Sequence, residues 1–136
     1  MSYELREHTA DVAVEATGED IDEVFVYVAE GLSAAHCESI PEGVGERFPV
    51  VAHAESKDAL LFEYLDELIY QRDVRSVLPA GHEARVHWNG EWVLEGSARG
   101  VPFDAVEARE IKAVTYSEME LEETDEGWRA YVVFDV

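Results

Sequence analysis

Basic residues are scarce in this sequence. Its 136 residues include 10 lysines and arginines against 31 aspartates and glutamates, which gives a formal net charge of −21 at pH 7. Only Lys57 and Lys112 are lysines. Nucleic-acid binding proteins usually carry a basic surface, so we expect no direct binding to nucleic acid.

The acidic residues are spread over the whole chain and form no tail. A dispersed negative charge repels itself at low salt, and a Debye length of about 3 Å at 1 M salt screens most of that repulsion. We therefore expect a halophilic host with a salty cytoplasm. The alternative is an acidic mimic of nucleic acid, but such a protein would gather its acids on one face, and the even spread argues against it.

Several common signatures are missing. The single cysteine, Cys37, excludes an internal disulfide and the usual structural zinc patterns. The sequence contains no P-loop, no GxGxxG and no GxSxG motif. No signal peptide is recognisable, and the longest strictly apolar run, Val24 to Ala29, is too short to cross a bilayer. We therefore expect a cytoplasmic protein without membrane contact.

Hydrophobic periodicity predicts a single α+β domain over residues 1–136. Asp20 and Ser56 are expected to cap two amphipathic helices, and Asn89-Gly90 predicts a type I′ hairpin. The remaining pattern predicts a mainly antiparallel sheet on which the two helices pack. The expected helices are residues 20–37 and 57–72, and the expected strands are residues 3–6, 12–17, 46–54, 74–78, 84–88, 91–98, 111–122 and 131–136.

Two aspartates lie at the ends of expected strands. Asp11 comes just before the strand 12–17, and Asp135 is the penultimate residue, followed by Val136. If the two strands pair, the aspartates and the α-carboxylate of Val136 come close together. Carboxylates about 4 Å apart repel by roughly 1–4 kcal/mol, and either a hard divalent cation or uptake of a proton relieves this repulsion.

Lys112 is a candidate for interaction with these carboxylates. It lies in REIKAVTYS, in a chain that otherwise uses arginine. A lysine offers a compact ammonium group with three donors, suited to the aspartates, to a phosphate or to a carboxylate of a partner. The simpler alternative is a surface residue that balances a neighbouring acid such as Glu110.

Six motifs follow one another from Tyr3 to Val136: HTADV, VFVYVAEGL, LLFEYLDELIY, GVPFD, EIKAVTY and the closing WRAYVVFDV. Their order and spacing resemble those of the archease family. The resemblance implies a fold that contains a strand–helix–strand–strand module. It also implies an accessory protein and not a free-standing enzyme.

Archease assists the RtcB-class RNA ligase, which joins tRNA exon halves after intron removal. This ligase is guanylylated by GTP on a histidine, and the resemblance implies that the present chain promotes guanylylation and repeated turnover. It further implies a bound divalent cation, calcium in the first place, with magnesium or manganese as alternatives. The implied ligands are Asp11, Asp135 and Val136, and Lys112 is implied to be functional.

The sequence departs from the family pattern in two places. Ser117 follows EIKAVTY where the family usually has a histidine, so no role of that histidine carries over. The segment from Ala105 to Arg109 is also short. His8 does match the family, and either orients Asp11 through a hydrogen bond or only completes the turn.

Two further functions stay open. The first is a chaperone-like binding module for tRNA-modifying enzymes such as a tRNA methyltransferase. The second is a stand-alone metal-dependent hydrolase, which ranks last because the sequence shows no paired nucleophile and base. The sequence leaves the oligomeric state open.

Overall fold

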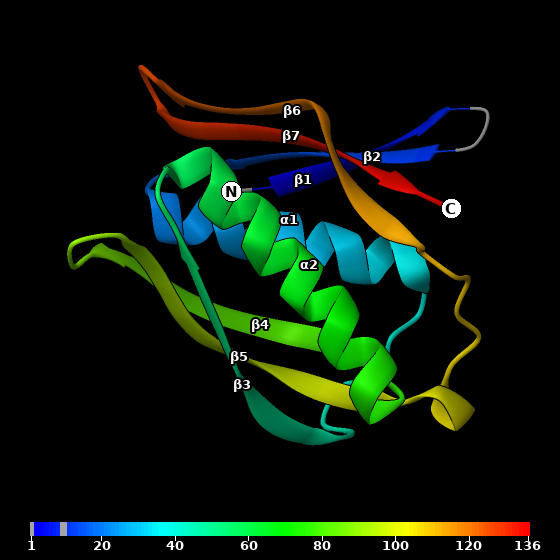
Figure 1. The fold of residues 1–136 in the computed structure, drawn as a ribbon. Helices are drawn as coiled ribbons and strands as arrows, with labels where there is room; N and C mark the ends of the chain where they lie inside the picture. The colour runs from blue at the N-terminus through cyan, green and yellow to red at the C-terminus, as the bar shows by residue number, and fades with distance from the viewer. Residues whose placement is uncertain (1, 9–10) are drawn as a thin grey trace.

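Two antiparallel sheets enclose two helices in the computed structural model, which describes residues 2–8 and 11–136 (Figure 1). The four-stranded sheet has the order β1-β2-β7-β6, and the three-stranded sheet has the order β3-β5-β4. The elements are β1 (Ser2–His8), β2 (Asp11–Gly18), α1 (Ile21–His36), β3 (Glu46–Ala54), α2 (Lys57–Arg75), β4 (Val77–Trp88), β5 (Trp92–Pro102), the 3-10 turn η1 (Phe103–Ala105), β6 (Ala113–Thr124) and β7 (Gly127–Asp135).

Both helices begin at the predicted caps. The carboxylate of Asp20 accepts a hydrogen bond from the Glu23 amide at 2.8 Å, and the Ser56 hydroxyl accepts one from the Ala59 amide at 3.1 Å. Each cap satisfies an amide that the first helical turn leaves without a partner. In the described part of the chain, neither helix has the length and apolar character that crossing a membrane requires.

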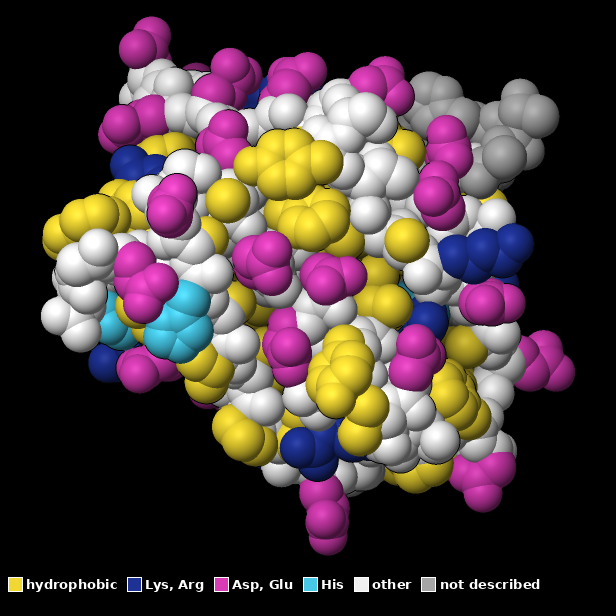
Figure 2. Space-filling view, viewed as in Figure 1, with side chains coloured by type: hydrophobic (Ala, Val, Ile, Leu, Met, Phe, Trp, Pro, Cys, Tyr) yellow, Lys and Arg dark blue, Asp and Glu magenta, His cyan; other side chains and the backbone are white. Residues whose placement is uncertain are grey.

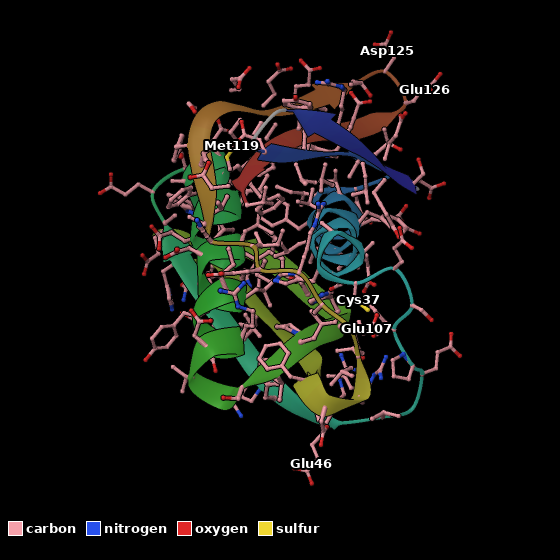
Figure 3. The ribbon with its side chains drawn as sticks, turned by 90° about the vertical axis from the view of Figure 1, so that its right-hand side faces the viewer. Cys37, Glu46, Glu107, Met119, Asp125 and Glu126 are labelled. Atoms are coloured by element: carbon pink, nitrogen blue, oxygen red, sulfur yellow. The ribbon has the colours of Figure 1, made fainter. Side chains whose placement is uncertain are left out.

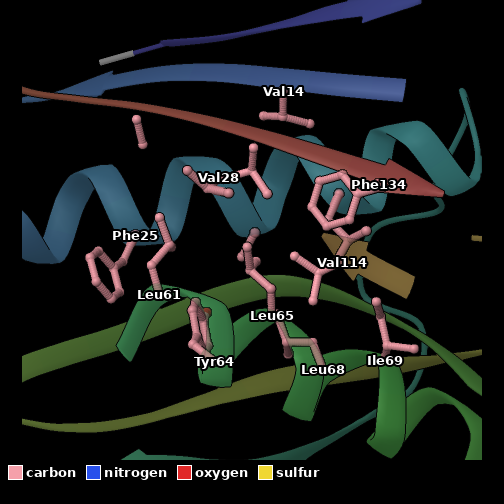
Figure 4. Close-up of a cluster of buried hydrophobic side chains, with 14 of the residues drawn as sticks. Val14, Phe25, Val28, Leu61, Tyr64, Leu65, Leu68, Ile69, Val114 and Phe134 are labelled. Carbon is pink, nitrogen blue, oxygen red and sulfur yellow. The ribbon is translucent and has the colours of Figure 1, made fainter. Parts of the chain in front are cut away.

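The main hydrophobic core lies between the sheets and is shared by all three layers (Figure 4). Val14 and Phe134 reach down from the four-stranded sheet, Val28 comes from α1, and Leu61 and Leu65 come from α2. All five are fully buried, and each such side chain stabilises the fold by about 1.5–3 kcal/mol relative to an exposed one. The layers are therefore held by one continuous set of apolar contacts.

The α+β class, the two helices and the antiparallel pairing are confirmed. The strands divide between two sheets, however, where we expected one, and the helices lie between the sheets. The three-stranded sheet arises from the run β3-α2-β4-β5, so the implied strand–helix–strand–strand module is present. Pro49 lies in β3, an edge strand, where its missing amide costs no ladder hydrogen bond.

Several boundaries differ from the prediction. The expected strand 74–78 is wrong at its start, because Val74 and Arg75 still belong to α2. Val77 and Leu78 join the expected strand 84–88 in one strand, β4, since a register shift between Ala80 and Glu83 lets pairing with β5 continue through the irregular part. The Asn89-Gly90 hairpin is not of type I′. Trp88 pairs with Trp92 across a three-residue loop, and only Gly90 has a positive φ, whereas type I′ needs one at both central residues.

Candidate functional site

The register of β2 and β7 brings the two predicted aspartates together. Asp11 and Asp135 are directly opposite each other in this antiparallel pair. Residues opposite one another point to the same face of a sheet, with Cβ atoms about 4.5–5.5 Å apart. Figure 1 shows the C-terminus emerging beside the end of β2 where Asp11 lies.

The aspartates lie on the outer face of the four-stranded sheet. Their neighbours Val12 and Phe134 are fully buried and belong to the core between the sheets. Because side chains alternate along a strand, Asp11 and Asp135 point away from the helices. Asp135 is exposed and Asp11 is half-buried, so both carboxylates are accessible to an ion or a partner.

Lys112 lies beside Asp135, immediately before β6. Its backbone N–H donates to the carbonyl oxygen of Asp135 at 2.8 Å, and Ala113 is opposite Asp135 in the β6–β7 pair. The Lys112 side chain is exposed and forms no ion pair with any described residue, including Glu110. The ammonium group therefore remains available to a partner next to the two aspartates.

The chain end is docked in the sheet. β7 runs to Asp135, and the half-buried side chain of Val136 packs against the main core. This contact holds the C-terminal residue next to Asp135 and restricts where its α-carboxylate can lie. A frayed terminus would not do so.

The structure says less about two other predicted positions, His8 and Ser117. His8 is opposite Asp11 in the β1–β2 pair, but its side chain lies outside the described residues, as do Thr9 and Ala10. Ser117 is exposed in an irregular stretch of β6, between the register positions Thr115 and Glu120. The surroundings of Ser117 therefore give no indication of the role that a histidine would have at this position.

Other carboxylates on the same face share one arginine. Arg129 donates to Glu15 at 2.7 and 3.0 Å, to Glu120 at 2.8 Å and to Glu122 at 3.3 Å. The hydrogen bonds that Arg129 donates to Glu120 and Glu15 raise its pKa above the usual value. Asp11 and Asp135, by contrast, form no ion pair with a described residue. Among the side chains that the structure describes, no cation lies against this pair of facing acids.

The donor chemistry at this end fits a hard cation. Two side-chain carboxylates and a terminal carboxylate are oxygen ligands, which calcium, magnesium and manganese prefer. No group of three or more His, Cys, Asp or Glu side chains with metal-binding spacing occurs among the described residues, so the α-carboxylate of Val136 would have to complete the set. The role of these residues as ligands stays a prediction.

The sequence of the chain matches the Archease protein family (MTH1598/TM1083) over residues 3–136. It is similar to the protein archease of Pyrococcus furiosus, with 29% identity over 98% of each chain. It is also similar to that of Methanosarcina mazei, with 32% identity over 98% of this chain and 95% of the other.

Two solved structures share the fold. Protein 1598 of Methanobacterium thermoautotrophicum aligns with a TM-score of 0.87 and 27% identity, covering 99% of each chain. An archease of Thermotoga maritima, described as a possible chaperone, aligns with a TM-score of 0.66 and 24% identity over 96% of this chain and 94% of the other. The second likeness bears on the fold alone.

Proposed function

The chain belongs to the archease family, and on this premise we propose that it activates an RtcB-class RNA ligase during tRNA splicing in the cytoplasm. It promotes guanylylation of the ligase and its repeated turnover, and it is not itself the enzyme. The observation that carries the proposal is the facing pair Asp11 and Asp135, accessible and without an ion-pair partner among described residues, with Lys112 beside it.

The end of the sheet that carries Asp11, Asp135, Val136 and Lys112 is called the tip below. Each group at this tip has a distinct task. Asp11, Asp135 and the α-carboxylate of Val136 would hold a divalent cation, which there cancels their repulsion and accepts further oxygen ligands. Lys112 offers its donors to a phosphate or carboxylate of the ligase. Docking of Val136 in the core pre-organises the tip, so little conformational entropy is lost when the partner binds.

The test is ligation of tRNA halves by the host's ligase at limiting ligase concentration, together with transfer of labelled GMP from GTP to the ligase. We expect Asp11→Ala and Asp135→Asn to reduce the stimulation about 10- to 100-fold, in line with the effect of losing a group that supports a metal site. Lys112→Gln should reduce it without affecting cation binding, since Lys112 is not among the proposed ligands.

A matched control is available on the same sheet. Asp125 is exposed in the β6–β7 turn, at the opposite end of the strands from Asp135 (Figure 3). Asp125→Asn removes the same charge from the same hairpin and should stimulate the ligase as wild type does. If Asp11→Ala also stimulates fully, the role assigned to the tip is wrong.

A chaperone-like function is the second candidate, favoured by exposed apolar side chains. Tyr70 and Val74 on α2 are 58% and 61% exposed, and Tyr116 on β6 is 51% exposed. Figure 2, in the same view as Figure 1, shows hydrophobic side chains lying among acidic ones on the face toward the viewer. The client would be a tRNA-modifying enzyme such as a tRNA methyltransferase. Light scattering of the heated client separates the two functions, because a chaperone needs neither divalent cation nor GTP.

A further inference from the structure

A cavity of about 360 Å³ lies where the C-terminal ends of α1 and α2 meet the linker between η1 and β6. It is separate from the Asp11–Asp135 tip, and neither aspartate lines it. Figure 3 shows the linker residue Glu107 close to Cys37, the residue that follows α1; both also line a neighbouring hollow. The cavity walls include His36, Arg72, Phe103, Val106, Ala108 and Arg109.

Arg72 is the unusual residue in this wall, because its side chain is only 8% exposed. Its Nε–H donates to Asp73 at 2.9 Å, and its Nη1 donates to the Ile111 carbonyl and, at 3.0 Å, to Nε2 of His36. The two hydrogens on Nη2 have no acceptor among the described residues. Nη2 keeps contact with solvent, because the only described side-chain N and O atoms that are fully buried without a partner are Tyr64 Oη and His82 Nδ1. Its hydrogens can therefore be offered to a ligand that enters the cavity.

His36 fixes the orientation of this guanidinium. Its Nδ1–H donates to the Leu32 carbonyl at 2.9 Å, so Nε2 carries the lone pair that accepts from Arg72. Burial lowers the pKa of His36 from 6.5 to about 4, and the ring is therefore neutral at pH 7. It holds Arg72 in place without adding a charge to the cavity.

The charge in the cavity wall is balanced, in a chain whose net charge is −21. Only eight of its residues are arginines, and two of them, Arg72 and Arg109, line this cavity. Arg109 is held at the end of α1, where its Nε–H donates to the Ala35 carbonyl at 2.8 Å. Asp73 and Glu110 also line the cavity, so the four charges cancel. A singly charged anion therefore meets no net negative charge in the cavity wall itself.

We propose that this cavity binds a small molecule with an oxyanion group, a phosphate or a carboxylate, on an apolar or aromatic body. Nε and Nη1 of Arg72 are already used, so an oxyanion would accept a charge-assisted hydrogen bond from Nη2 alone. Phe103, Val106 and Ala108 supply an apolar wall for the body of the ligand. The volume falls in the range of about 300–1,000 Å³ that small-molecule sites occupy. The site goes beyond the proposed function and does not depend on it.

The test is a titration of the full chain with three probes: inorganic phosphate, phenyl phosphate and phenylacetate. Two-dimensional NMR follows the Arg72 Nε–H signal and the amides of Ile111 and Lys112, since Ile111 accepts from Arg72. We expect saturable shifts at these signals with at least one aromatic probe. Comparing phenyl phosphate with phenylacetate tells which oxyanion the site prefers.

A neighbouring arginine provides the control. Arg75 is exposed on the same helix, three residues after Arg72, and lies over the Phe48 ring instead of in the cavity. Arg72→Gln should abolish the shifts, whereas Arg75→Gln, which removes the same charge, should leave affinity within about twofold. Equal binding by wild type and Arg72→Gln, or no saturable binding of any probe because water alone fills the cavity, overturns the proposal.

A second variant keeps the test decisive if Arg72→Gln fails to fold. Phe103 is 41% exposed, and no residue of η1 is buried, so Phe103→Ala should fold normally. We expect this variant to bind phenyl phosphate about fivefold more weakly and inorganic phosphate unchanged, because only the aromatic contact is lost. An unchanged affinity for phenyl phosphate would place the ligand elsewhere and refute the assignment.

Discussion

Replacing Asp135 by asparagine should shift the stability of the protein in opposite directions with and without a divalent cation. Asp135 is directly opposite Asp11, and neither forms an ion pair with a described residue. Two charges about 5 Å apart repel by roughly 1 kcal/mol at a dielectric constant of 80 and by roughly 3 kcal/mol at 20. Because Asp135 is exposed, the smaller figure applies. With a chelator and at low salt, Asp135→Asn should therefore unfold with a free energy about 1 kcal/mol higher than wild type.

With the cation present the order should reverse. A ligand at 100 times its Kd stabilises the folded state by about 2.7 kcal/mol. An unfolding entropy of about 2.1 cal/mol/K per residue over 136 residues is ~0.29 kcal/mol/K, so wild type should gain about 9 °C in Tm. The asparagine variant has lost one charged oxygen ligand and should gain little.

Thermal unfolding followed by circular dichroism, first with a chelator and then with increasing calcium, measures both halves of this prediction. The control is Asp125→Asn, which removes an exposed acid from the far end of the same hairpin and should respond to calcium as wild type does. Parallel responses of Asp135→Asn and wild type would refute the reasoning. A wild-type Tm that no divalent ion shifts, at any salt concentration, would refute it as well.

Four further predictions concern stability. The Tm should rise with KCl from about 0.1 to 3 M, because salt screens the repulsion of a net charge of −21, and a flat profile contradicts this. Tyr64→Phe should raise the unfolding free energy in urea by about 1 kcal/mol, since the buried hydroxyl meets no partner among the described residues; exposed Tyr70→Phe should change nothing. Burial holds the pKa of His36 at about 4 against 6.5, so the unfolded chain binds the extra proton between these values. Stability should therefore fall as pH drops through this window, and less so in His36→Gln than in the exposed control His53→Gln. Gly96→Ala should destabilise by about 2 kcal/mol or more in the same urea titration, because its Cβ would lie 2.1 Å from a carbonyl oxygen of β4.

The meeting of Asp11 and Asp135 could be predicted because both belong to strands with a clear period of two. Alternation fixes which residues face the core, and the apolar residues of YVVF indicate that the last strand is buried on one side. Once two such strands pair, residues at their ends must come together on one face. The observed register between β2 and β7 agrees with this pattern, although alternation alone does not exclude a register shifted by two residues.

The division into two sheets could not be predicted from local pattern. Alternation says that a strand has a buried face, but it does not say which other strand is its neighbour. β2 pairs with β7 across more than a hundred residues, and β3 joins β5 and β4 instead. Such pairing between distant segments depends on the packing of the whole chain and not on the local pattern.

The buried Arg72 was missed although a signal was present. It lies four residues after Leu68 and so continues the buried stripe of α2 that includes Leu61 and Leu65. His36 similarly lies four residues after Leu32 on α1. Polar residues on an apolar stripe at the ends of two helices indicate a buried polar contact between them, and the hydrogen bond from Arg72 to His36 is that contact.

One short segment joins the tip and the cavity. The Ile111 carbonyl accepts from Arg72 in the cavity wall, and the next residue, Lys112, donates its amide to the Asp135 carbonyl. Ile111 is fully buried, so this segment cannot move at one end without disturbing the other. The position of Lys112 beside the two aspartates is therefore set partly by Arg72. Arg72 lies at the end of α2, contacts His36 at the end of α1, and holds the residue before Lys112 by its hydrogen bond to the Ile111 carbonyl.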